Sequence, residues 1–260
     1  MRSSTAAGGD SVSEHRGEYG YDGSFHTVSA GTQLAVVGAG SAALLAGAGI
    51  SLARGNRVAA TLAAGSAVEI IATAAWYIYA TRSGKFRVWD GVLDDLALRG
   101  DETLLDLGCG RGAVLLAAAK RLPRGRAIGV DLWQADQTDN SPQSTLSNAE
   151  REGVTERVEL HTADMTALPL PDESVDVIVS NLAIHNIPTR VGRRLALDQA
   201  VRVLRPGGRL AIADLWETRQ HEQRLRELGW CNVRRRNLGW RMWYGGPWFS
   251  TRLVTATKPM

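Results

Sequence analysis

Residues 103–113 of the chain read TLLDLGCGRGA, and this stretch decides the fold. Its apolar first half contains Asp106 and is followed by three glycines at alternate positions, Gly108, Gly110 and Gly112. The sequence continues as VLLAAA, which favours a helix. A strand, a glycine turn and a helix bring backbone close to a ligand, because glycine has no Cβ atom and the helix N-terminus offers free N–H groups. The stretch therefore predicts a site for a nucleotide-like ligand.

Composition limits the class of protein. The 260 residues leave room for one α/β domain and an appendage of roughly 100 residues. The net charge of +3 does not by itself indicate a nucleic-acid partner. Two cysteines, Cys109 and Cys231, supply neither a disulfide framework nor a metal-binding cluster. We therefore expect a reducing compartment and no metal site.

The first 33 residues differ in composition from the rest of the chain. Residues 1–33 are rich in Gly, Ser, Asp, Glu and His and show no apolar periodicity, which predicts a disordered tail. They carry no apolar core flanked by basic residues, so a standard secretory signal is not expected.

Two long apolar segments follow the tail. Residues 34–53 contain no charge, and residues 58–80 contain only Glu69, so each is long enough for a helix that crosses ~30 Å of hydrocarbon. We predict a two-helix membrane hairpin over residues 34–80. The aromatic and basic residues at its end place the rest of the chain in the cytoplasm, although Arg54 and Arg57 in the turn oppose that orientation. A soluble helical hairpin is the alternative.

The first apolar segment also contains a string that matches a dinucleotide-binding motif. Residues 34–43, LAVVGAGSAA, fit G-x-G-x-x-A. No acidic residue ends a following strand, since residues 59–61 read AAT, so the membrane hairpin is the preferred interpretation. Glu69 either marks a polar site within the membrane or faces the partner helix.

Residues 81–100 predict an amphipathic linker helix. Apolar residues including Phe86, Trp89 and Leu93 recur at helical spacing. This helix either covers the ligand site or packs on the sheet. Residues 101–260 then form the remaining domain.

Two acidic residues follow the next strands of that domain. Residues 126–130 form a short apolar strand that ends on Asp131, where a carboxylate can bind ribose hydroxyls. Residues 157–161 form the next strand, which leads to Asp164 and Met165. Asp164 can accept from the amino group of an adenine, and Met165 can pack on its ring.

The second half of the domain continues the alternation of strands and helices. Residues 175–181 form a buried strand, residues 191–204 a helix, residues 205–208 (RPGG) a turn and residues 209–214 a strand. This order predicts an α/β fold with a doubly wound, mostly parallel sheet.

Four motifs in this order and spacing resemble the signatures of class I S-adenosylmethionine-dependent methyltransferases, especially the small-molecule branch that includes quinone-biosynthesis enzymes. They are residues 106–112 (DLGCGRG), 129–131 (GVD), 163–165 (ADM) and 203–208 (VLRPGG). The resemblance covers roughly residues 98–259. It implies a seven-stranded sheet whose last strand is antiparallel, S-adenosylmethionine as cofactor, and a methionine portion held by Asp106 and the glycine turn.

Other function classes stay open beside the methyltransferase. The glycine turn also fits an NAD(P)-dependent oxidoreductase, and a non-catalytic cofactor-binding assembly factor at the membrane is possible. Asp106, the Asp164–Met165 pair and the Pro-Gly-Gly turn favour the methyltransferase. Residues 181–184 read NLAI, without the Pro-Pro pair of enzymes that methylate nucleic-acid amino groups, so no nucleic-acid substrate is expected.

Candidate catalytic residues follow the fourth strand. His185 lies just past this strand and is either a general base toward a hydroxyl or a structural residue at a strand end. Asn181 and Asn186 are placed to orient a substrate.

An aromatic segment lies between the last two strands. Residues 238–249, LGWRMWYGGPWF, contain three tryptophans and form either an apolar substrate cover, a membrane-interface belt or an aromatic cluster without a ligand. The sequence thus predicts a membrane-attached methyltransferase for a small, apolar or amphiphilic acceptor. It leaves the acceptor and the oligomeric state open.

Overall fold

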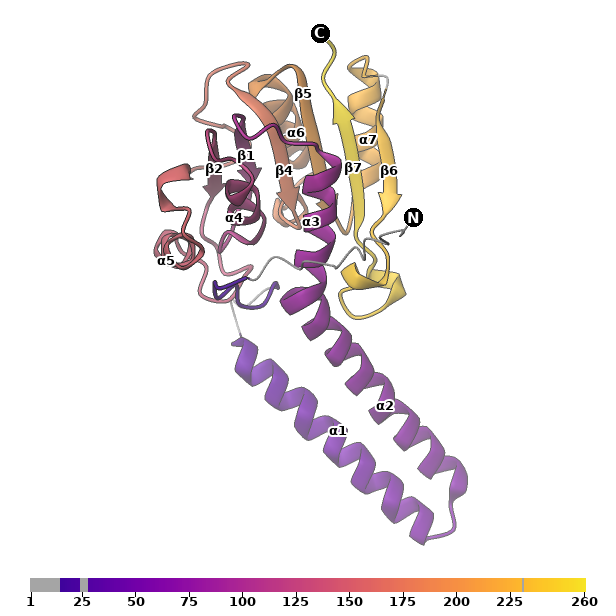
Figure 1. Ribbon diagram of the computed structural model, residues 1–260. Helices are drawn as coiled ribbons and strands as arrows, with labels where there is room; N and C mark the ends of the chain where they lie inside the picture. The colour runs from indigo at the N-terminus through magenta and orange to yellow at the C-terminus, as the bar shows by residue number, and fades with distance from the viewer. Residues whose placement is uncertain (1–14, 24–27, 231) are drawn as a thin grey trace, which may run out of the picture.

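The computed structural model describes residues 15–23, 28–230 and 232–260. A sheet covered by helices forms one part of the molecule, and a long two-helix hairpin projects from one end of it (Figure 1). The hairpin leaves from the side on which the parallel strands β1, β2 and β4 have their carboxyl ends.

The sheet has seven strands in the order β3-β2-β1-β4-β5-β7-β6. Strands β1 to β5 pair in parallel, and β7 is antiparallel to both β5 and β6, so the predicted topology is confirmed. The carboxyl ends of β1 and β4 meet where the strand order reverses, the position at which such sheets bind ligands. The bounds are Thr103–Leu107 (β1), Arg126–Asp131 (β2), Val158–Thr162 (β3), Val175–Asn181 (β4), Leu204–Asp214 (β5), Arg234–Asn237 (β6) and Arg252–Thr257 (β7).

Helices cover both faces of the sheet and create two apolar cores. Successive residues of β1 serve different cores, since Leu104 belongs to the core beneath α3 and α4, and Leu105 to the core beneath α6 and α7. This burial on both faces explains why the central strands are continuous apolar runs. The helices are Lys85–Asp95 (α3), Ala113–Lys120 (α4), Pro142–Glu152 (α5), Arg190–Val203 (α6) and Thr218–Glu227 (α7).

The predicted turn at residues 205–208 lies within β5. Pairing between β4 and β5 shifts register between Val175 and Val177, so these residues form an irregularity in the strand instead of a turn before it. Gly207 accommodates this with a φ of 74°.

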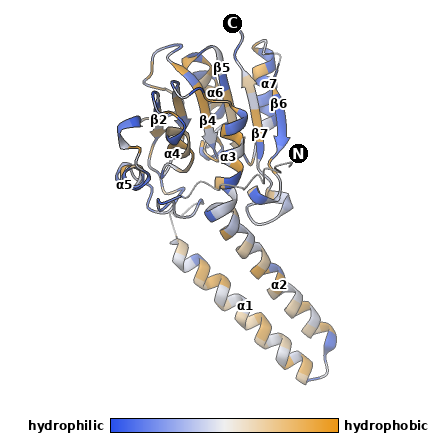
Figure 2. Ribbon diagram, viewed as in Figure 1, coloured by the Kyte–Doolittle hydropathy of each residue, from blue (hydrophilic) through white to orange (hydrophobic). Residues whose placement is uncertain are grey.

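The projecting hairpin consists of α1, Ala30–Ala53, and α2, Arg57–Tyr79. Both helices are long and apolar enough to cross a membrane, and little of either is buried within the protein. Figure 2 shows that apolar residues lie all along both helices. Ser29 caps α1, so the first helix begins four residues before the predicted start at residue 34.

The predicted linker is continuous with the hairpin. A π-helical turn, Ala80–Gly84, joins α2 to α3, and Arg57–Asp95 forms one helical run of 39 residues. Gly84 lies so close to the aromatic segment that an added Cβ would be 2.0 Å from the Arg241 carbonyl oxygen. The expected domain boundary at residue 80 therefore falls inside a helix. The amphipathic pattern is confirmed, because Phe86, Trp89 and Leu93 are buried in the core.

Residues 15–23 differ from the disorder predicted for residues 1–33. Tyr19 is buried, and its hydroxyl donates a 2.7 Å hydrogen bond to Glu152 of α5. The backbone N–H groups of Arg16 and Gly17 donate to the same carboxylate. The polar composition of the segment conceals this contact, because its partner lies more than 130 residues away. Residues 1–14 and 24–27 lie outside the described residues.

Candidate active site

The glycine turn after β1 lies at the reversal point of the sheet. Gly108, Gly110 and Gly112 have φ angles of 71°, 50° and 86°, a region that residues with a Cβ rarely adopt. A Cβ on Gly108 would also lie 2.2 Å from the Cβ of Ala183. Gly112 forms the N-cap position of α4. The turn therefore requires glycine for its conformation and, at Gly108, for close approach.

Two buried carboxylates flank this turn. The Asp131 carboxylate accepts hydrogen bonds from the backbone N–H of Gly110 at 2.8 Å and of Trp133 at 2.6 Å. Asp106 is buried as well, and its Oδ1 atom has no hydrogen-bond partner among the described residues. Burial, together with the charge of Asp131, raises the pKa of Asp106 to about 8. A cationic group placed beside Asp106 would satisfy this oxygen and stabilise its charge.

Two adjoining cavities open at the turn. The first, about 50 Å³, is lined by residues that include Asp106, Gly108, Gly110 and Asn181. The second, about 220 Å³, shares Gly108 and Asp131 with the first and extends past Asp164 and Met165. Asp164 is exposed, and its Oδ1 accepts from the backbone N–H of Thr166 at 2.8 Å. The predicted cofactor residues thus lie along one continuous groove, apart from Gly112, which starts α4.

His185 lies in a short helical turn, Ile184–Asn186, directly after β4. Its Nδ1 atom is 2.5 Å from Oδ1 of Asp214, and its backbone N–H donates to Oδ2 of the same carboxylate at 3.1 Å. Asp214 ends β5 and is buried. The Nδ1 contact holds the ring and the backbone contact holds the main chain of His185. With the proton on Nδ1, Nε2 is able to accept one.

A third cavity, about 570 Å³, includes His185 in its lining. Leu182, Leu215 and Trp216 give part of it an apolar wall, and the Trp216 ring meets the His185 ring edge-on at 5.2 Å between centroids. Tyr77 of α2 and Tyr244 of the aromatic segment also line it. Its size is that of an ordinary small-molecule site, about 300–1,000 Å³.

The two asparagines predicted to orient a substrate occupy different places. The Asn181 side-chain oxygen accepts a 2.8 Å hydrogen bond from the Trp89 indole of α3, and Asn181 lines the first cavity but not the third. The Asn186 amide donates to Asp136 at 2.9 Å, and Asn186 lines the second and third cavities. Asn186 is therefore the better placed of the two to contact an acceptor.

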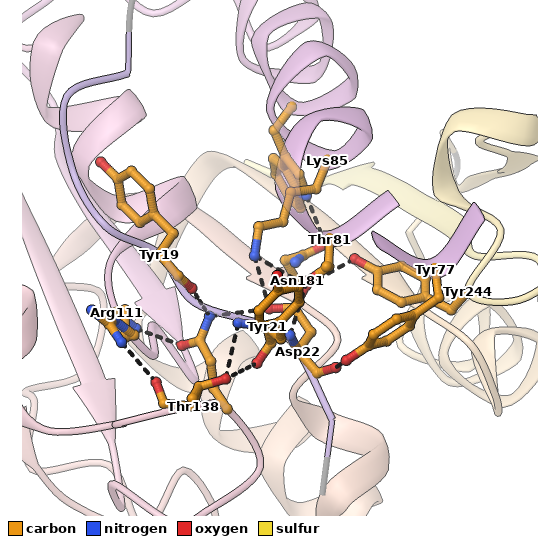
Figure 3. A network of polar contacts seen from close by, with 12 residues as sticks. Tyr19, Tyr21, Asp22, Tyr77, Thr81, Lys85, Arg111, Thr138, Asn181 and Tyr244 are labelled. Atoms are coloured by element: carbon orange, nitrogen blue, oxygen red, sulfur yellow. Dashed lines mark hydrogen bonds and ion pairs between the residues drawn. The ribbon is translucent and has the colours of Figure 1, made fainter. Parts of the chain in front are cut away.

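Sequence reasoning missed several residues of the site. Asp214 follows an apolar strand as Asp131 does, but only the β4–β5 pairing shows that it lies beside His185. A second group joins the described part of the N-terminal segment to the groove through hydrogen bonds and an ion pair (Figure 3). Its members include Asp22, Tyr77, Lys85, Gln137 and Tyr244.

Residues 105–212 match the family model described as a methyltransferase domain. This part of the chain is therefore similar to a methyltransferase domain. The matched range contains the glycine turn, Asp131 and Asp164. A methyltransferase of this fold has been solved with S-adenosylhomocysteine, the demethylated form of S-adenosylmethionine. Asp106, whose Oδ1 has no hydrogen-bond partner among the described residues, fits the cationic end of that cofactor. The match favours this domain over the NAD(P)-dependent oxidoreductase.

Curated relatives of the methyltransferase domain act on different molecules. The chain is 37% identical over 132 residues to the ubiquinone/menaquinone biosynthesis C-methyltransferase of Dinoroseobacter shibae, a match that covers 50% of each chain. It is 35% identical over 130 residues to the 27-O-demethylrifamycin SV methyltransferase of Amycolatopsis mediterranei, covering 49% of this chain and 44% of that one. The chain thus spans about half the length of the curated relatives it matches.

Solved structures show the same fold as the methyltransferase domain. The [4+2]-cyclase SpnF superimposes with a TM-score of 0.54 at 20% identity, over 66% of this chain and 82% of that one. The geranyl diphosphate C-methyltransferase of Streptomyces coelicolor A3(2) gives 0.51 at 18% identity, over 65% and 78%. Because one of these proteins is named a cyclase, the fold alone does not decide the reaction.

Proposed function

We propose that this chain is an S-adenosylmethionine-dependent methyltransferase that acts on a small, apolar or amphiphilic acceptor at a membrane surface. The observation that carries the proposal is the His185–Asp214 pair in a partly apolar cavity beside the cofactor groove. That cavity shares Asp136 and Leu182 with the groove, so an acceptor in it lies next to the cofactor's methionine end.

The residues of the groove divide the cofactor between them. Asp106 would bind the α-amino group, Asp131 the ribose hydroxyls, and Asp164 with Met165 the adenine. Bound S-adenosylmethionine would supply an electrophilic methyl group on a sulfonium. The glycine turn would hold the methionine portion in place, and orientation accounts for much of the rate in reactions of this kind.

His185 serves as the general base in this proposal. Asp214 accepts a hydrogen bond from Nδ1 of the imidazole and holds the ring, so that Nε2 would accept the proton of an acceptor hydroxyl or acidic C–H. The electron pair freed on that oxygen or carbon would form the new bond to methyl, and the electrons of the broken methyl–sulfur bond would stay on sulfur. Asp214 is a positioning residue that also stabilises the imidazolium that forms. Trp216 packs against the ring edge and limits its rotation.

The hairpin anchors the chain in the membrane. Helices α1 and α2 have the length and apolar surface of membrane-spanning helices. Trp76 in the last turns of α2 stacks on Trp243, and Tyr79 stacks on Trp240, so aromatic rings gather where α2 meets the domain. Rings of this kind favour the headgroup level of a bilayer.

The acceptor cavity lies at this same level. Tyr77, from the last turn of α2, forms part of its wall together with Tyr244 of the aromatic segment. Arg82 and Arg87 follow the hairpin, and their charge favours a cytoplasmic domain. An acceptor dissolved in the bilayer would therefore reach His185 after a short movement toward the domain.

A methyl-transfer assay tests the enzymatic part of the proposal. The full chain in detergent is incubated with methyl-labelled cofactor and a membrane extract that contains lipids and quinones, beside a His185→Gln variant. We expect labelled product with the wild type and at least about 100-fold less with the variant, the usual contribution of a general base. If the wild type binds cofactor and labels nothing, the non-catalytic binding factor is the better description.

Alkaline carbonate extraction tests the anchor. A hairpin that spans the bilayer keeps the full chain in the membrane pellet at high pH, whereas a surface-bound protein is released. Recovery of the chain in the supernatant would contradict the anchor and leave the enzymatic proposal intact.

A further inference from the structure

The polar cluster around Asp22 joins three parts of the molecule. Lys85 of α3 donates to both oxygens of the Asp22 carboxylate, at 2.8 and 3.0 Å. Gln137 donates to the same carboxylate at 3.0 Å, and so does the Tyr244 hydroxyl. The Asp22 carbonyl oxygen also accepts from the Tyr77 hydroxyl. Figure 3 shows the side chains of Lys85, Tyr77 and Tyr244 gathered around Asp22.

Asp22 and Lys85 lie inside the methionine half of the cofactor groove. Both line the 50 Å³ cavity together with Asp106, Asp131 and Asp136. Among the described residues that line this cavity, Lys85 is the only cation. It is almost fully buried, with 1% of its side chain exposed, so its charge is directed to neighbours within the protein and not to solvent.

Without Lys85, the acidic cavity would match only the positive charge of the cofactor's amino-acid end and not its negative charge. The amino-acid end of the cofactor carries an ammonium and a carboxylate. Asp106, buried and unpartnered at Oδ1, suits the ammonium. The carboxylate would instead be repelled by the carboxylates of the lining, and a buried anion needs a cation or several donors. Lys85 is the group that can supply this charge.

We infer that Lys85 binds the α-carboxylate of the cofactor, and that Asp22 competes with that carboxylate for the same ammonium. The inference rests on the proposed use of S-adenosylmethionine. Asp22 carries a carboxylate, the same chemical group as the end of the cofactor's methionine portion. This carboxylate lies at hydrogen-bonding distance from Lys85, and both residues line the groove.

The size of the cavity supports competition. About 50 Å³ is small beside the ~300–1,000 Å³ of usual small-molecule sites. Asp22 and Gln137 both line this cavity. Gln137 Oε1 accepts a hydrogen bond from the backbone N–H of Arg111 and lies 2.4 Å from the position of a Cβ on Gly110. The methionine end gains room when Asp22 gives up Lys85.

Competition also connects the cofactor with the acceptor cavity. Asp22 lines the acceptor cavity as well as the groove, and it binds Tyr77 and Tyr244, which both belong to the cavity wall. Release of Lys85 from Asp22 changes the charge at this wall. Cofactor binding would thereby prepare the cavity for its acceptor.

Two ligands distinguish binding of the carboxylate from binding of the rest of the cofactor. S-Adenosylhomocysteine contains the amino-acid end, whereas 5′-methylthioadenosine lacks it and keeps the adenosine. Their affinities for the full chain in detergent are measured by titration calorimetry for the wild type, Lys85→Gln and Asp22→Asn. Glutamine can still donate to Asp22, so the first variant keeps a hydrogen bond while it removes the charge.

We expect Lys85→Gln to bind S-adenosylhomocysteine about 10- to 150-fold more weakly, the range for loss of a charged hydrogen bond, with an unchanged affinity for 5′-methylthioadenosine. Asp22→Asn should raise the ratio of the two affinities in favour of S-adenosylhomocysteine, because Lys85 loses its competitor. The unchanged affinity for 5′-methylthioadenosine reports that each variant is folded.

The outcomes separate the inference from the proposed function. If the wild type binds neither ligand, the cofactor assignment fails. If the wild type binds both and Lys85→Gln weakens both equally or neither, Lys85 does not bind the carboxylate. If Asp22→Asn lowers the affinity ratio, Asp22 assists cofactor binding and the competition is refuted.

Discussion

Replacing Asp106 by asparagine should make the ligand-free protein more stable at neutral pH and weaken its hold on the cofactor. Asp106 is buried, its Oδ1 atom has no hydrogen-bond partner in the described part of the chain, and burial raises its pKa to about 8. The unfolded chain ionises this carboxyl near pH 4, so at pH 7 the folded chain holds a proton that the unfolded chain has released. Asparagine is nearly the same size as aspartate, and its amide does not have to take up a proton when the chain folds.

The magnitude follows from the two pKa values. Each pH unit between them costs roughly 1 kcal/mol of folding free energy, so the penalty is small at pH 5 and on the order of 4 kcal/mol at pH 7. Because the folded pKa lies above the unfolded value, the stabilising contribution of the protonated carboxyl is complete below pH 4 and is lost as the pH rises to 8. The advantage of the Asp106→Asn variant should widen over the same range.

Unfolding of the full chain in detergent, followed by tryptophan fluorescence between pH 5 and pH 8, measures this difference. The eight tryptophans of the chain give a strong signal. S-Adenosylhomocysteine should raise the unfolding temperature of the wild type more than that of the variant, since its ammonium pairs with an ionised Asp106. Equal stability of both proteins across this pH range, or a more stable wild type at pH 7, would refute the reasoning.

Two other substitutions test positions outside the groove. Asp214→Asn should reduce kcat by ~10²–10⁴ and shift the pH–rate profile while the Kd for S-adenosylhomocysteine stays the same, because it frees the His185 ring; a parallel loss of cofactor binding would show a merely structural role. Gly84→Ala should cost about 1–3 kcal/mol in chemical unfolding, because its Cβ would meet the Arg241 carbonyl oxygen at 2.0 Å. Gly91→Ala on the same helix is the control, since the space around its Cβ is open and no loss is expected. Equal effects of the two alanines would contradict the proposed close contact.

Local sequence patterns predicted the glycine turn, the strand ends and the topology of the sheet. A left-handed turn requires glycine, and strands buried on both faces require apolar runs. Both features can therefore be recognised from consecutive residues of the sequence. Asp131 was singled out because it directly follows such a run, and Asp164 because it comes shortly after the next predicted strand. The antiparallel β7 was implied by resemblance to a family and did not come from the residues themselves.

Hydrogen-bond partners that lie far apart in the sequence cannot be recognised from consecutive residues. Asp22 lies in a polar segment, and its partner Gln137 is 115 residues further along the chain. His185 was singled out by its place after β4, but its partner Asp214 becomes visible only when β4 and β5 are paired in parallel, which brings their carboxyl ends together. A search for acidic residues at the ends of neighbouring strands would have found it.

In the proposed membrane arrangement, the continuous helix from Arg57 to Asp95 would fix the distance between the bilayer and the candidate active site. The 23 residues of α2 rise about 35 Å, close to the thickness of the hydrocarbon layer, and α3 then continues into the core beside the groove. Because one continuous helical run joins α2 to α3, the proposed base His185 would lie at a fixed height above the lipid. Acceptors would then be chosen by how far their reactive atom lies from their lipid-soluble tail, and lengthening α2 by one turn should change that preference before it changes the catalytic residues.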